Sequence, residues 1–234
     1  MTRAKLGWLL LACVVVVPAF AEKAPNKKMD IFWQSPEFAA HEPRAIAMLP
    51  AATYDGSVEA RQAVETAVAK ALRGAGYRWT STLITRDRLL RSGGDSLLKA
   101  LNAQLLKEPR LDSLEAPGYS RLMSSDALLT IRVDRYEQYK LEVYQSGKAT
   151  TTVGLTVALV DSSGRLLWRG IGLETAEGVY YDAGSSQVDT SPSALTNRMT
   201  PQAGPPSYAE TLGKLLVRWV PQFPAKSAAT TPAN

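Results

Sequence analysis

The feature that most constrains the fold is a run of strand-like segments between residues 126 and 174. "DALLTIRVDRYEQYKLEVYQSG" alternates apolar and polar residues, "KATTTVGLTVALVD" does the same after a Ser-Gly pair, and "RLLWRGIGLE" follows. The tetrad 161–164, "DSSG", is a turn composition, because Asp and Ser hydrogen-bond the local backbone and Gly tolerates positive φ. The pattern predicts an antiparallel meander in the C-terminal half.

The first of these segments is unusually long for a strand. Its odd positions are apolar at both ends, but Arg135 and Glu137 interrupt them midway. A strand of about 16 residues exceeds the usual 3 to 10 and would reach roughly 50 Å at 3.3 Å per residue. We therefore expect it to bend or to project beyond the core.

The N-terminal half alternates strand and helix signals. "RAIAMLP" from Arg44 is typical of a buried strand, residues 57–75 have helical periodicity with Ser57 as the cap, and "YRWTSTLI" indicates a second strand. Residues 85–125 read as helices, interrupted at "RSGGD", and "SYAE" over 207–210 is a capping box that begins a C-terminal amphipathic helix. The predicted fold class is therefore α/β (α+β), a three-layer-like mixed sheet with an antiparallel C-terminal meander, covered by helices.

The N-terminus has the pattern of a signal peptide. Arg3 and Lys5 precede an apolar stretch over 6–17, and the small-x-small site Ala19-Phe20-Ala21 follows. The stretch is shorter than the roughly 20 apolar residues of a bilayer-spanning helix, so we expect no transmembrane span in the mature chain. "LLAC" at Cys13 is an alternative lipoprotein cleavage box, which would make Cys13 a lipidated first residue. Export with removal at residue 21 is favoured over lipidation.

Composition, together with the positions of proline and glycine, divides the chain into segments. The expected organisation is a signal peptide over 1–21, a leader arm over 22–42, one α/β domain over 43–221 and a disordered tail over 222–234. Residues 179–204 are rich in Ser, Thr, Gly and Pro and are expected to form a long loop. In the arm, the apolar cluster within "MDIFWQSPEF" favours packing on the domain over an exposed partner-binding patch.

Few residues are suited to catalysis. The formal charge is +5, and without Arg3 and Lys5 the chain has 25 basic and 22 acidic residues, a balance too mild to indicate nucleic acid. His41 is the only histidine, and Cys13 the only cysteine. Nucleophile, metal and phosphate-loop motifs are missing, and "RSGGD" favours a plain turn over an anion site. We therefore predict no catalytic, metal or cofactor residues, and His41 as an exposed linker histidine.

Charged and aromatic residues on the long strand are the remaining candidates. Arg135, Tyr136 and Tyr139 are predicted as partner contacts. The carboxylate pairs Asp134/Glu137 and Glu174/Glu177 could flank a glycosidic bond, but solvated strand charges are the commoner explanation.

Three stretches together resemble a group of Gram-negative envelope proteins. These are "EPRAIAMLPAATYDGSVEA", "SSDALLTIRV" and "VALVDSSGRLLWRG". The group comprises the curli-secretion lipoproteins, the penicillin-binding-protein activators, the Pel polysaccharide-export lipoprotein and small lipoproteins of the neisserial antigen type. The last, a domain family of unknown function, is most similar: its "P-R-x-I-x-x-L-P" and "D-A-x-L" motifs map onto 43–50 and 126–129, and its hairpin motif maps onto 160–170. The position of Cys13 departs from the pattern.

The resemblance implies a compact periplasmic α/β domain, with outer-membrane association, that assists an export or assembly machine. It supplies no active-site residues. The expected function is a non-enzymatic accessory or scaffold protein that contacts envelope proteins or copies of itself. The alternative is an envelope enzyme or regulator that acts on peptidoglycan or polysaccharide.

Overall fold

The computed structural model describes residues 28–142, 145–181 and 204–227. The predicted signal peptide, Cys13, residues 182–203 of the expected loop and the end of the tail lie outside these ranges. The strands are β1 (Lys28–Gln34), β2 (Ala45–Met48), β3 (Ala52–Thr53), β4 (Arg78–Thr80), β5 (Ala127–Tyr139), β6 (Gly147–Asp161) and β7 (Leu166–Tyr181). The helices are α1 (Val58–Leu72), α2 (Thr82–Lys107), α3 (Ala116–Met123) and α5 (Tyr208–Trp219), with short 3₁₀ turns at Phe38–His41, Arg73–Ala75 and Val220–Gln222.

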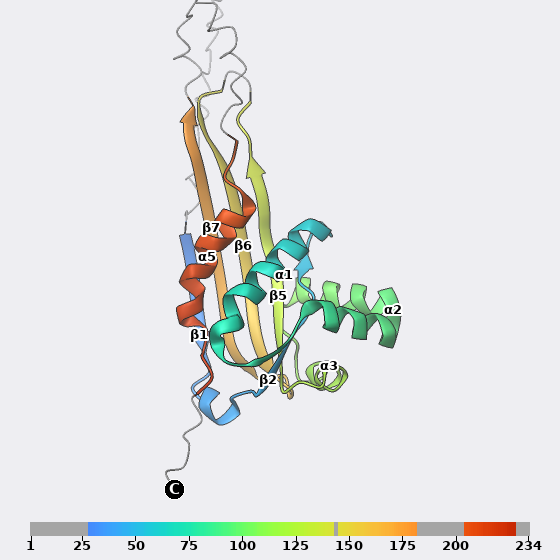
Figure 1. Ribbon diagram of the computed structural model, residues 1–234. Coiled ribbons are helices and arrows are strands. Elements are labelled where there is room, and N and C mark those ends of the chain that lie inside the picture. The colour runs from blue at the N-terminus through green and yellow to red at the C-terminus, as the bar shows by residue number, and fades with distance from the viewer. Residues whose placement is uncertain (1–27, 143–144, 182–203, 228–234) are drawn as a thin grey trace, which may run out of the picture.

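One mixed sheet organises the molecule. Its strand order is β1-β7-β6-β5-β2-β4, and β3 pairs with β5. β2 runs parallel to β4 and β5, whereas β5, β6, β7 and β1 are antiparallel neighbours. α1 and α5 cross the front of the sheet in Figure 1, and α2 and α3 lie to the right of β5. The predicted mixed α/β class with a C-terminal meander is confirmed.

Local signals read from the sequence form as expected. The Asp161 carboxylate accepts hydrogen bonds from the backbone NH groups of Ser163 and Arg165 at 2.8 and 2.9 Å, and Gly164 has φ +87°. The hydroxyl oxygens of Ser57 and Ser207 cap α1 and α5. These contacts are local, which is why composition alone predicts them.

The core has two parts, one on each face of the sheet. On the front face, alternate residues of β5, β6 and β7 pack against α1 and α5, and an aromatic cluster fills the space beneath α5. Trp168 is at its centre, 5.0 Å from the ring of Phe223 and 6.1 Å from that of Trp219. On the other face, leucines of α2 pack with α3 against β2 and β5.

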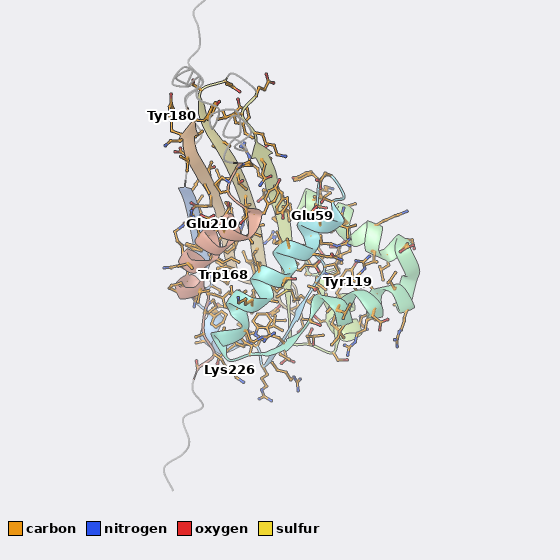
Figure 2. The ribbon with its side chains drawn as sticks, turned by 45° about the horizontal axis from the view of Figure 1, so that its top comes forward. Glu59, Tyr119, Trp168, Tyr180, Glu210 and Lys226 are labelled. Atoms are coloured by element: carbon orange, nitrogen blue, oxygen red, sulfur yellow. The ribbon has the colours of Figure 1, made fainter. Side chains whose placement is uncertain are left out.

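Three sequence-based boundaries are wrong. β1 joins the sheet beside β7, so part of the expected leader arm belongs to the domain. Residues 82–84, predicted as strand, begin α2. Phe223 is 5% exposed, and Lys226 NH donates to the Ala75 carbonyl at 2.8 Å, so the packed chain extends past 221. Figure 2 shows Lys226 at the end of the molecule opposite Tyr180.

The meander is longer than the helices that cover it. β5, β6 and β7 continue beyond α1 and α5 at the top of Figure 1. Val179–Tyr181, expected in the long loop, are the last residues of β7. β5 both bends and projects, because its register against β6 shifts between Val133 and Arg135.

Candidate interaction surfaces

The bulge in β5 decides where the predicted contact residues point. Before it, Val133 lies on the front face with the core. After it, Tyr136 pairs with Val153, so Tyr136 takes the front face and Arg135 and Tyr139 lie on the opposite one. The structure therefore does not bring the three predicted residues together in one patch.

Tyr136 is used in packing. Its ring stacks on that of Tyr208 in α5, with centroids 3.8 Å apart and planes at 7°. Burial, with smaller contributions from Tyr208 and Glu59, raises the pKa of Tyr136 to about 12. This tyrosine holds α5 against β5, so it is less accessible to a partner than the sequence suggested.

Arg135 and Tyr139 remain exposed on the other face. Arg135 is 3.6 Å from the Glu137 carboxylate and lines a hollow of about 450 Å³, together with Tyr54 and Asp55 of the β3–α1 loop. Tyr139 is about half exposed. Figure 2 shows Tyr180 exposed farther along the same projecting strands. These residues stay candidates for partner contact.

Asp134 and Glu137 line the same hollow as Arg135, whereas Glu174 and Glu177 lie on opposite faces of β7. Asp134 accepts hydrogen bonds from Arg132 and Thr156, both at 2.6 Å. Lys148 bonds Glu177 at 2.8 Å. Each of these carboxylates is bound to a partner of its own, which is the arrangement of structural charges.

Glu174 is the exception to the expected solvated strand charges. It is 3% exposed and lies beneath α5, where it accepts a hydrogen bond from Arg218. The Arg218 Nε also donates to Asp30 of β1 at 2.5 Å, and Trp219 Nε1 donates to the same carboxylate at 3.2 Å. We call Asp30, Glu174 and Arg218 the buried charge cluster. It joins β1, β7 and α5, and the sequence pattern gave no sign of it.

β1 divides its apolar residues between the two faces of the sheet. Phe32 packs on Trp168 and Trp219 of the core, as an arm packed on the domain would. Met29, Ile31 and Trp33 alternate with it and are 43%, 53% and 45% exposed. The predicted packing is therefore right for one face only, and we call these three side chains the β1 patch.

A second apolar surface lies between α1 and α5. The groove has a volume of about 1,110 Å³ and is lined mainly by small and apolar side chains, including Ala63, Ala67, Gly213, Val217 and Val220. Val217 is 73% exposed. The small residues of α1 therefore line an open groove in part.

The expectations for metal ligands and for His41 can be compared with the described residues. No group of three or more His, Cys, Asp or Glu side chains that could hold a metal occurs there. His41 is half-exposed and contacts the Arg165 guanidinium, with Glu37 3.8 Å away. No described helix is both long and apolar enough to cross a membrane.

Comparison with known proteins gives similarity in structure only. No protein-family model matches the chain, and no curated protein matches it. Among solved structures, the PelC dodecamer from Paraburkholderia phytofirmans has a TM-score of 0.48 and 16% identity, over 86% of this chain and 99% of that one. Lipoprotein GNA1162 from Neisseria meningitidis has a TM-score of 0.45 and 21% identity, over 68% and 100%.

The hypothetical protein CT253 from Chlamydia trachomatis is also similar, with a TM-score of 0.34, 10% identity and coverage of 75% and 95%.

Proposed function

We propose that the protein is a non-enzymatic accessory protein of the cell envelope that works by association. It joins copies of itself and assists an outer-membrane export or surface-assembly machine. The signal-peptide pattern and the family resemblance support the envelope location. The observation that carries the mode of action is the open edge of β1 with its exposed patch.

The backbone of β1 leaves hydrogen-bonding groups free. Ser35 NH donates to the Leu167 carbonyl at 2.9 Å, in register with the β1–β7 pairing. Hydrogen-bonded pairs alternate along an antiparallel ladder, so Met29, Ile31 and Trp33 use their backbone groups on β7. The groups of the residues between them point to the edge, where no described strand pairs with them.

A second copy of β1 complements this edge. Antiparallel pairing with Ile31 opposite Ile31 places Met29 of each copy opposite Trp33 of the other, and uses the full length of Lys28–Gln34. These side chains then occupy the pairs without hydrogen bonds, where opposite strands approach most closely. β1 contains no proline, and its pairing with β7 has no bulge, so it lacks two usual protections of a sheet edge.

The test is the mass in solution of the chain expressed with its own leader and purified from the envelope fraction. We expect a dimer or larger assembly by light scattering. Ile31→Lys should give a monomer, because the charge would lie in the paired patch. Val217→Lys, on the opposite face of the sheet, is the matched control and should keep the assembly.

A wild-type monomer, or an Ile31→Lys assembly of unchanged mass, would refute the edge-pairing mode. If Val217→Lys loses association instead, the contact between copies lies in the α1–α5 groove. Turnover of peptidoglycan or polysaccharide fragments by the same preparation would favour the enzyme alternative.

A further inference from the structure

A pocket of about 430 Å³ lies near the carboxyl end of β2. Here the helices that connect the parallel strands pack on opposite faces of the sheet. β2 lies between its parallel neighbours β4 and β5. The chain leaves β2 for α1 on one face, and α2 packs on the other, where the Thr85 hydroxyl donates to the Met48 carbonyl at 2.7 Å. In sheets with parallel strands, such a switch point at the carboxyl ends is where ligands bind.

Side chains from three parts of the chain line this pocket. They are Pro50, Ala51, Thr53 and Gly56 after β2, Arg61 of α1, and Arg86, Asp95, Leu98, Lys99, Leu101 and Asn102 of α2. We call it the switch-point pocket. Its volume is within the range of small-ligand sites, about 300 to 1,000 Å³.

Cations outnumber acids in the lining. Arg61, Arg86 and Lys99 face one carboxylate, that of Asp95. In the part of the chain that the structure describes, neither Arg86 nor Lys99 forms an ion pair with an acidic side chain. The lining therefore carries a net positive charge.

Arg61 is the most constrained of the three cations. Its side chain is 19% exposed, and its Nε and Nη2 atoms are buried without a hydrogen-bond acceptor. Glu65, 3.9 Å from the Arg61 Nε, instead accepts a hydrogen bond from Ala51 NH at 2.9 Å. Two buried guanidinium nitrogens without acceptors are unfavourable, and an anion in the pocket would provide acceptors after a rotation of the side chain.

A polar neighbour adds a further donor. The Asn102 side-chain oxygen accepts from Thr53 NH at 3.3 Å, which leaves the amide NH₂ group to donate. A planar carboxylate is satisfied by a single arginine fork, whereas a tetrahedral phosphate accepts from several directions. We propose that the switch-point pocket binds a phosphate group, either of a free phosphate compound or of a lipid headgroup.

The test is titration of the full exported chain with inorganic pyrophosphate at constant ionic strength, followed by calorimetry. We expect saturable binding that Lys99→Gln weakens about tenfold, the loss of one charge-assisted hydrogen bond. Arg86→Gln should have a similar effect. Lys107→Gln, the same change at the far end of α2, is the matched control and should bind as the wild type does. Lys99 is exposed, so its variant should fold normally.

Vesicles of phosphatidylcholine with phosphatidic acid distinguish the two sources of phosphate. Co-sedimentation that Lys99→Gln abolishes assigns the pocket to a lipid headgroup, and binding of pyrophosphate alone assigns it to a free compound. The proposal is overturned if neither probe binds saturably, if acetate binds equally well, or if Lys107→Gln weakens binding as much as Lys99→Gln.

Discussion

Replacing Arg218 by methionine should destabilise the fold through the carboxylates that it leaves behind. Methionine keeps much of the apolar stem, so the change isolates the lost charge. Asp30 is 17% exposed at its side chain and retains its hydrogen bond from Trp219, whereas Glu174 is 3% exposed and loses its cation. Breaking a buried ion pair from one side costs about 3–5 kcal/mol. For a chain of this size, that corresponds to a fall in Tm of roughly 6–20 °C.

Urea unfolding followed by tryptophan fluorescence measures this loss, because Trp168 and Trp219 lie next to the buried charge cluster. Adding Glu174→Gln to Arg218→Met should recover most of it, leaving about 1 kcal/mol for the missing hydrogen bond. The slope of the unfolding free energy against urea concentration should be the same in wild type and variants if the folded state is retained. A single variant within about 1 kcal/mol of wild type, or a double variant with no recovery, would contradict the reasoning.

The remaining predictions concern separate sites. Gly164→Ala should lose roughly 2–4 kcal/mol in urea unfolding, because φ is +87° and a Cβ would lie 2.5 Å from backbone atoms of the segment after α2; wild-type stability would contradict this. The pKa of Tyr136 is about 10 in the unfolded chain and about 12 in the folded one. The contribution of Tyr136 to the free energy of unfolding is therefore full below pH 10 and is lost as the pH rises to 12. Tyr136→Phe should flatten that part of the stability profile, and an unchanged profile would exclude Tyr136 as its source. Arg135→Glu and Tyr139→Ala should change stability by less than about 0.5 kcal/mol yet reduce recovery of envelope partners in pull-downs, and equal recovery would remove both as contacts.

Sequence patterns predicted the parts of the fold that depend on neighbours along the chain. Alternation predicted the meander, and the turn at Asp161 and the caps at Ser57 and Ser207 follow from side chains that bond the adjacent backbone. The bulge was visible only as an unexplained interruption, the charged Arg135 in an apolar row. One extra residue reverses the faces of a strand, and composition does not show where it is inserted.

The candidate sites depend on contacts between distant residues, which a single sequence does not reveal. Glu174 reads as a surface charge until Arg218, 44 residues later, is packed above it. Phe223 reads as the start of a tail until the aromatic cluster that encloses it is formed. The switch-point pocket joins residues from α1 and from α2 on both sides of Gly94, whose φ of +63° interrupts that helix, and no spacing motif records that assembly.

If the chain is exported as proposed, the buried charge cluster has a consequence for the order in which the chain folds. Asp30 and Arg218 are 188 positions apart, and β1 pairs with a strand that begins at residue 166. A polypeptide that crosses a membrane from its N-terminus therefore presents β1 first, whereas β7 and Arg218, which hold β1 in the sheet, follow last. During the proposed translocation, β1 would therefore stay accessible to chaperones and to the β1 segments of other chains.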